Sequence, residues 1–285
     1  MAMRNIKILF ATTLICSFVS IAANAQKLPN VQQGSVRAPA DIKIDGKVTE
    51  WNNQFKAYNH ATDIFYTLSN DDQNLYLTVQ ATDPAVIRKI ISGGVCLTVQ
   101  PSGKKTDKDG MRVVYPVTIA TQAKGMVISV MTLKRNAASD NAQLSDKEAD
   151  SVMMARNKQF SQRSKWIGTL GFKDLDSLIS VYNEDGIRVA GRYDAKGAFT
   201  CELSVNLKLL GLSVDNPAKF SYHILLNGVS MFNSNRQPDQ VITVMGSGAQ
   251  MAGGENSMMA GKIMMDLGGG GAATDFWGEY ALTPK

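Results

Sequence analysis

Cysteine and histidine are scarce in this chain of 285 residues, which contains three Cys and two His. The histidines are His60 and His223, and neither a Cys-x-x-Cys pair nor a His-Glu-x-x-His motif occurs. Zinc catalysis needs ligands at fixed spacings, and a histidine-based triad needs a nucleophile and an acid beside its histidine. The sequence therefore gives little support to either kind of active site, and three cysteines do not make a disulfide scaffold.

A strong excess of one charge is also lacking. Thirty Lys and Arg against 25 Asp and Glu give a formal net charge of +5, and two of the basic residues, Arg4 and Lys7, stand close to the N-terminus. This balance is too mild to indicate a nucleic-acid partner.

Catalytic patterns are missing as well, because the chain has no phosphate-binding loop and no nucleophile motif. Four carboxylates near predicted strand ends match turn and capping roles as well as catalytic ones. We therefore expect no enzyme activity and no cofactor. These carboxylates are Asp45, Glu50, Asp63 and Asp83.

The chain has one long hydrophobic run, residues 8–21, and it lies near the N-terminus behind Arg4 and Lys7. Ala23-Asn24-Ala25 follows with small residues at the positions that signal peptidase reads, so we interpret residues 1–25 as a secretory signal peptide. No second run follows, which predicts a mature protein without a transmembrane segment, in the periplasm or outside the cell.

The cysteines leave two questions open. Cys16 is compatible with a lipoprotein signal, but the bulky Ile15 before it fits an acylation site poorly and the later cleavage site fits better. Cys96 and Cys201 remain after cleavage, and they could form a disulfide or stay as buried thiols.

The rest of the chain reads mainly as short β-strands after a polar N-terminal lead at residues 26–41. Segments rich in Val, Ile, Thr, Tyr and Leu alternate with turn residues such as Ser69-Asn70-Asp71-Asp72 and Asp83-Pro84, which is typical of antiparallel β structure. The predicted strands are residues 63–68, 74–82, 95–100, 111–119, 126–133, 186–193, 199–205, 220–226 and 278–282.

Residues 136–181 interrupt this pattern. Ser145-x-x-Glu148 is a capping box that predicts a helix to about Phe160, and residues 172–181 predict a second short helix. Because strands on both sides are needed to close the sheets, we predict one domain, residues 42–285: an all-β, jelly-roll-like antiparallel β-sandwich with a helical insertion. The Met- and Gly-rich residues 245–271 indicate either a loop that binds copper(I) or an apolar ligand, or an inserted flexible loop.

Four segments, in order along the chain, carry a resemblance to family 9 carbohydrate-binding modules, which belong to a wider group of DOMON-like sandwiches. The first is Ile44-Asp45-Gly46 with Trp51, and the second is Asn74-Leu75-Tyr76 followed by Asp83-Pro84. The third is residues 198–202 with Leu209-Leu210-Gly211, and the last is Phe276-Trp277-Gly278-Glu279-Tyr280.

The resemblance implies a secreted, non-catalytic sandwich that binds a polysaccharide or oligosaccharide beside enzymes of polysaccharide breakdown. Family members hold a sugar between two Trp side chains, but this chain has Ile90 with Ser92-Gly93-Gly94 at one of those places and residues 268–271, all Gly, at the other. Arg112 and Asn227 match polar positions of the family site.

Each of the three tryptophans is a candidate to stack on a sugar ring. Trp51 and Trp277 lie in motifs that begin and end the sandwich, so we expect both in the core. Trp166 lies in the interrupting segment and is the candidate for a replacement platform, or else it anchors that segment. The candidate ligand-binding residues are thus Arg112, Asn227 and Trp166.

Two other functions remain open at this point. A haem-binding domain of the related superfamily would use His223 and a Met as axial ligands, although His223 also fits a strand residue bonded to a neighbour. A structural or assembly role at the cell surface would use the interrupting segment instead. The sequence names neither the glycan nor the oligomeric state.

We predict that the mature protein begins at Gln26, because Ala23 and Ala25 are the best-placed small residues behind the apolar run. The intact mass of protein exported by the expressing cell checks this. A lipid-bearing N-terminus at Cys16 would contradict it and indicate a membrane anchor.

Overall fold

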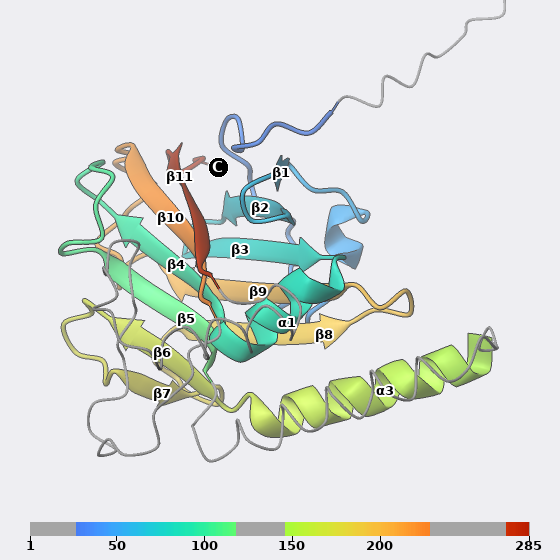
Figure 1. Cartoon of the computed structure of the whole chain (residues 1–285). Coiled ribbons are helices and arrows are strands. Elements are labelled where there is room, and N and C mark those ends of the chain that lie inside the picture. Colours follow the sequence, from blue (N-terminus) through green and yellow to red (C-terminus); the bar gives the residue numbers. More distant parts are fainter. Residues whose placement is uncertain (1–26, 118–145, 229–271, 285) are drawn as a thin grey trace, which may run out of the picture.

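The structure is a computed structural model that describes residues 27–117, 146–228 and 272–284, with residues 146–149 described by backbone alone. The predicted signal peptide, the predicted strand at residues 126–133, the Met- and Gly-rich segment and Ser145 of the capping box lie outside the described residues. Strands dominate the described part, and they form two antiparallel sheets (Figure 1).

The first sheet has five strands in the order β1-β2-β3-β9-β8, and every neighbouring pair is antiparallel. Its hairpins turn where the sequence predicts. Asp71 accepts backbone N–H bonds from Gln73 and Asn74 between β2 and β3, and Asp194 accepts them from Lys196 and Ala198 between β8 and β9. The strands are β1 (Ala57–Asn59), β2 (Ile64–Asn70), β3 (Asn74–Ala81), β8 (Ile187–Tyr193) and β9 (Phe199–Asn206).

The second sheet has six antiparallel strands in the order β11-β10-β4-β5-β6-β7. It packs on the first sheet, so the prediction of an all-β antiparallel sandwich is confirmed, while the jelly-roll connectivity stays a prediction (Figure 1). The strands are β4 (Val95–Gln100), β5 (Met111–Val117), β6 (Trp166–Leu170), β7 (Leu178–Ser180), β10 (Phe220–Leu226) and β11 (Thr274–Tyr280).

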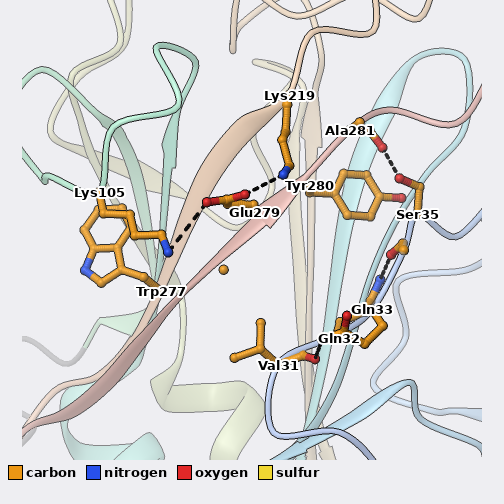
Figure 2. A pocket seen from close by; sticks show the side chains of 12 residues that line it. Val31, Gln32, Gln33, Ser35, Lys105, Lys219, Trp277, Glu279, Tyr280 and Ala281 are labelled. Carbon is orange, nitrogen blue, oxygen red and sulfur yellow. Dashed lines mark hydrogen bonds and ion pairs between the residues drawn. The ribbon is translucent and has the colours of Figure 1, made fainter.

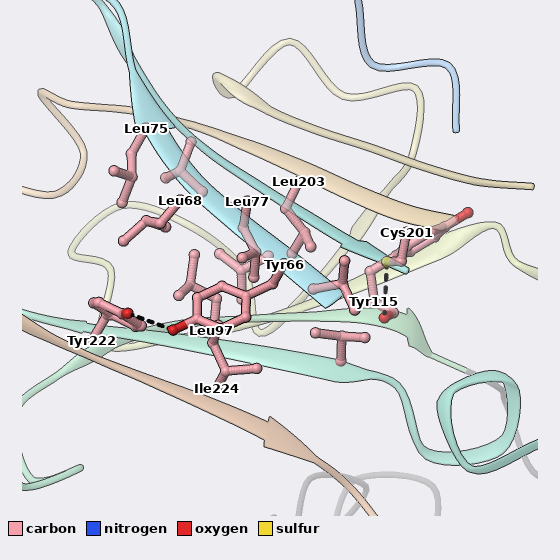
Figure 3. Packing of buried hydrophobic residues seen from close by; sticks show 14 of the residues in the cluster. Tyr66, Leu68, Leu75, Leu77, Leu97, Tyr115, Cys201, Leu203, Tyr222 and Ile224 are labelled. Atoms are coloured by element: carbon pink, nitrogen blue, oxygen red, sulfur yellow. Dashed lines mark hydrogen bonds between the residues drawn. The ribbon is translucent and has the colours of Figure 1, made fainter. Parts of the chain in front are cut away.

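The core lies between the inward faces of the sheets, where Leu, Ile, Val and aromatic side chains meet (Figure 3). Two polar contacts cross it. The hydroxyls of Tyr66 in β2 and Tyr222 in β10 lie 3.0 Å apart, and the thiol of Cys201 in β9 donates to the carbonyl of Tyr115 in β5 at 3.9 Å. The backbone N–H of Gln32 also donates to Tyr66, so both tyrosine hydroxyls are hydrogen-bonded, which keeps the cost of burying them low.

Both cysteines are buried and free in the structure. Cys201 belongs to the core between the sheets, whereas Cys96 belongs to a separate small cluster with Val114 and Leu225. Burial raises the pKa of both thiols, and that of Cys96 reaches about 12. The open question of a disulfide is thus answered in favour of two buried thiols.

A helix that the sequence reasoning missed closes one end of the sandwich. Asp83-Pro84 was expected to be a turn, but Asp83 accepts N–H bonds from Ala85 and Val86 and starts α1 (Pro84–Gly93) with Pro84 in its first turn. Ile87 and Ile90 bury this helix against the core. A one-turn 3₁₀-helix, η1, spans Thr49–Trp51.

The interrupting segment is helical only in its first part. The predicted helix is present as α3 (Asp146–Arg163), but the second helix, predicted over residues 172–181, is wrong. Residues 166–170 and 178–180 form β6 and β7 instead, because Ile167 and Ile179 face each other across the pair and both enter the core. Neither α1 nor α3 is long and apolar enough to cross a membrane, and no other described helix is.

Two side chains anchor α3 to the sandwich: Asn157 exchanges two hydrogen bonds with the backbone of Tyr193 in β8, and Phe160 supplies the apolar contact. Phe160 packs edge-on against Phe199 and Tyr115, with ring centroids 5.0 and 6.1 Å apart, and Gly191 leaves room for it. A Cβ at Gly191 would lie 2.6 Å from the Phe160 ring. The N-terminal turns of α3 run past the edge strand β8, beyond the sheets (Figure 1).

We predict that Phe160→Ala destabilises the protein by about 3 to 5 kcal/mol, because it removes a buried aromatic ring and leaves a cavity. Met154→Ala, on the same helix at a side chain that is 70% exposed, should change the free energy of unfolding by less than about 0.5 kcal/mol. Urea unfolding of both variants checks this, and equal effects would contradict the anchoring role of Phe160.

Candidate functional site

A row of polar and aromatic side chains crosses the outer face of the six-stranded sheet. Trp277 in β11 lies opposite His223 in β10, His223 lies opposite Thr98 in β4, and Thr98 lies opposite Arg112 in β5. Residues directly opposite on neighbouring strands share a face, and the residues on either side of each member turn inward. The row therefore brings side chains from four strands together.

His223 is the centre of this row and is only 5% exposed. Its Nδ1 lies 3.0 Å from Oδ1 of Asp107, and its Nε2 lies 2.8 Å from Oδ2 of Asp275. The Trp277 ring stacks on the imidazole with centroids 4.4 Å apart and 6° between the planes. Two carboxylates and an indole thus fix the position of the imidazole ring.

Arg112 extends the network from β5 and is 8% exposed. Its Nε donates to Oγ1 of Thr98 at 3.2 Å, and a terminal guanidinium nitrogen lies 3.4 Å from Oδ1 of Asp107. Burial alone raises the pKa of Asp107, but the hydrogen bond with His223 and the charges of His223 and Arg112 outweigh it and lower that pKa. Asp107 is therefore a carboxylate that links the guanidinium of Arg112 to the imidazole of His223.

The other two predicted ligand-binding residues do not reach this row. Asn227 follows β10 and donates its side-chain N–H to the carbonyl of Gly93 at 2.8 Å, which ties the end of β10 to the end of α1. Trp166 begins β6 opposite Val117 and Ser180, and it is half-buried. Asn227 comes four residues after His223, and Trp166 comes four residues before Leu170, which pairs with Arg112. Four residues of a strand span ~13 Å.

The tryptophan predictions have different outcomes. Trp51 is buried, as expected, at 9% exposure. Trp277 was expected in the core, but this is wrong: it is half-exposed on the outer face, while Phe276 and Tyr280 of the same strand enter the core. Strand alternation puts Trp277 on the face opposite Phe276, so the sequence itself held the information that places it outside.

A cleft of about 500 Å³ lies beside Trp277, between the edge strand β11 and the N-terminal lead (Figure 2). Glu279 projects into it between two lysines, with Lys219 Nζ at 2.6 Å and Lys105 Nζ at 3.6 Å. The hydrogen bond and charge of Lys219, with the charge of Lys105, lower the pKa of Glu279. Gln33 and Ser35 line the opposite side. The cleft therefore has the Trp277 indole on one side and polar side chains around the rest of its opening.

No protein-family model matches the chain. No curated protein matches it either. Within the described residues, no group of three or more His, Cys, Asp or Glu side chains could hold a metal ion. What the site can bind therefore depends on the chemistry of its own side chains.

His223 is poorly placed for the haem alternative. An axial ligand must offer a free ring nitrogen, and both nitrogens of His223 already face carboxylates at hydrogen-bond distance. Binding iron would require one of these contacts to break and the stacked Trp277 ring to move.

The Ile44-Asp45-Gly46 motif has a structural partner in Glu202. The backbone N–H groups of Asp45 and Gly46 donate to one carboxyl oxygen of Glu202 at 3.0 and 2.8 Å, and Oγ1 of Thr78 lies 3.5 Å from the other. Gly46 adopts φ +78°, and a Cβ there would lie 2.6 Å from Cβ of Arg192. Two segments of the resemblance, distant in sequence, thus meet over the first sheet.

Glu202 is 1% exposed, and burial raises the pKa of its carboxyl group to about 7, although the two N–H donors oppose the shift. The ordinary value is 4.5, so between these pH values the folded state binds more protons than the unfolded state. The free energy of unfolding contributed by Glu202 therefore falls as the pH rises through this range.

We predict that Glu202→Gln removes this loss, because an amide can accept the same N–H bonds without a charge. Relative to the variant, wild type should lose on the order of 3 kcal/mol of stability between about pH 4.5 and about pH 8. Urea unfolding at both pH values measures it, with Glu184→Gln, at an exposed carboxylate, as control. A difference between wild type and Glu202→Gln that does not vary with pH would contradict the assignment.

Proposed function

We propose that the protein is a secreted, non-catalytic carbohydrate-binding β-sandwich that assists polysaccharide binding or breakdown, and that its ligand stacks on Trp277. The observation that carries the proposal is the position of this indole ring, half-exposed on a sheet face at the wall of a polar cleft. The resemblance to family 9 carbohydrate-binding modules supports the same class of ligand.

Sugar chemistry explains why this arrangement suits a pyranose. The ring has apolar C–H faces that pack on aromatic surfaces, and a rim of hydroxyls that need hydrogen-bond donors and acceptors. His223 covers one face of the Trp277 indole, so a sugar would stack on the other face. Lys105, Glu279 and Gln33 supply polar groups around the same cleft.

The network behind Trp277 keeps the platform rigid. Asp107 and Asp275 fix the imidazole, Arg112 fixes Asp107, and the imidazole supports the indole. A platform that is already ordered pays little conformational entropy when the ligand binds. In this proposal Arg112 acts as a positioning residue for Trp277.

The two carboxylates that contact His223 favour binding over hydrolysis. Glycosidases place two carboxyl groups on either side of the scissile bond, with space between them for the sugar and a water. Asp107 and Asp275 also stand on either side of a gap, but the imidazole of His223 fills that gap. We therefore propose no turnover at this site.

We predict that Trp277→Ala weakens the binding of a saccharide about thirty-fold or more, or ~2 kcal/mol, because a stacked aromatic anchor is lost. Calorimetry with glucose, xylose, galactose, mannose, glucuronate and their disaccharides measures this. Trp166→Ala, at a half-buried indole on the same sheet, is the matched control and should bind as wild type does. If none of these sugars binds, or if Trp277→Ala binds unchanged, the proposal fails.

A further inference from the structure

A second row of side chains crosses the outer face of the five-stranded sheet. Tyr58 lies opposite Phe65, Phe65 opposite Gln80, Gln80 opposite Thr200, and Thr200 opposite Arg192. Each of the five strands supplies one member, and the residues next to them enter the core. The row therefore runs straight across the sheet, from an aromatic end to a polar end.

The aromatic end is a cluster of half-buried rings. The centroid of Phe65 lies 4.7 Å from that of Tyr58 and 5.8 Å from that of Phe55. Tyr58 also donates its hydroxyl to Asp63 at 2.9 Å, which fixes its orientation at the edge of the sheet. These rings belong to neither the core between the sheets nor the cleft beside Trp277.

The polar end is the floor of a separate cleft of about 390 Å³. Gln80 donates to Oγ1 of Thr200 at 3.1 Å, and both side chains line this cleft with Arg192. Met153 and Asn157 of α3 form its far wall. Two basic residues, Lys47 and Arg192, and two acidic residues, Asp150 and Asp194, line this cleft, so their charges balance.

The loop of residues 45–56 forms a side wall along the same row. At one end, Asp45 and Gly46 bind Glu202 of β9, and at the other the N–H of Lys56 donates to Oγ1 of Thr67 in β2 at 3.1 Å. Glu202, Thr78 and Thr67 lie opposite one another and make the neighbouring row. The loop thus crosses three strands one row away from Phe65, Gln80 and Thr200.

We propose that this row is a second binding site, which takes a neutral oligosaccharide in an extended conformation lying across the strands. Neighbouring strands are ~4.8 Å apart, close to the advance of one pyranose along an extended chain, so successive sugars would meet successive members of the row. Phe65 and Tyr58 offer apolar surface to a sugar face, and Gln80 and Arg192 offer donors and acceptors to hydroxyls. Thr200 is 2% exposed and fixes the amide of Gln80 by accepting its hydrogen bond.

The balanced charges around the cleft favour a neutral ligand over a uronate, because an anion would meet Asp150 and Asp194 as well as the two cations. The inference rests on the proposed function for the class of ligand alone. Its residues lie on the other sheet, and none of them lines the cleft beside Trp277.

Calorimetry with cellohexaose, xylohexaose and mannohexaose tests the site, with each corresponding monosaccharide and the curved maltohexaose for comparison. We expect at least one of the extended hexaoses to bind tenfold or more tightly than its monosaccharide. Phe65→Ala and Gln80→Ala should each weaken that binding at least tenfold. Tyr182→Ala, an exposed aromatic residue elsewhere, and Arg188→Ala, on the outer face of β8 in another row, are the matched controls and should not.

Melting temperatures show which variants fold, and Gln80→Ala keeps the test valid if Phe65→Ala destabilises the sheet. Hexaose binding that survives both substitutions, or no hexaose that binds more tightly than its monosaccharide, would overturn the second site. Loss of all binding in Trp277→Ala alone would overturn it while supporting the first site. Hexaose binding that depends on Phe65 and is unchanged in Trp277→Ala, with no monosaccharide bound, would support the second site and overturn the first.

Discussion

The antiparallel register of β10 between β4 and β11 is the constraint on which the rest of the molecule depends. All seven residues of this strand are buried, so both of its faces are used. On one face Tyr222 and Ile224 join the core, and on the other His223 lies between Thr98 and Trp277. A register shift of one residue would exchange the two faces, which would put the imidazole in the core and Tyr222 outside.

The same constraint explains how the sheet tolerates charge on its outer face. Arg112 and His223 are almost fully buried, and each faces a carboxylate of a loop or an edge strand. Removing Asp107 would leave the buried guanidinium of Arg112 without its carboxylate, and an uncompensated buried charge typically costs ~3 to 5 kcal/mol. The network is therefore a structural support for Trp277 that is costly to break and that holds the indole in one orientation.

Local sequence patterns predicted much of the fold. Alternating apolar residues gave most of the strands of both sheets, Asp71 and Asp194 marked the hairpin turns, and α3 was expected from its capping box. The errors arose where tertiary contacts outweigh local pattern. Asp83-Pro84 starts a helix that packs Ile87 and Ile90 on the core, and residues 166–170 and 178–180 become strands because Ile167 and Ile179 enter it.

The candidate site was harder to predict because its residues meet through pairing register and a loop. Arg112 was identified, but its partner Asp107 lies in the loop before β5, and Asp275 comes from the far end of the chain. Trp277 was assigned to the core because of the motif to which it belongs. The alternation of side chains between the two faces of β11 was not used. The row that contains Phe65 and Gln80 requires the order of five strands, which no local pattern encodes.

The indole N–H resonances of the three tryptophans test the central claim most directly, because Trp51, Trp166 and Trp277 occupy three different environments. Two-dimensional ¹H–¹⁵N NMR spectra of the mature protein would follow them during titration with the panel of monosaccharides and disaccharides. If the sugar stacks on Trp277, the resonance of that indole should move with ligand concentration while those of Trp51 and Trp166 stay in place. A Trp277 resonance that stays fixed while a sugar binds elsewhere would contradict it.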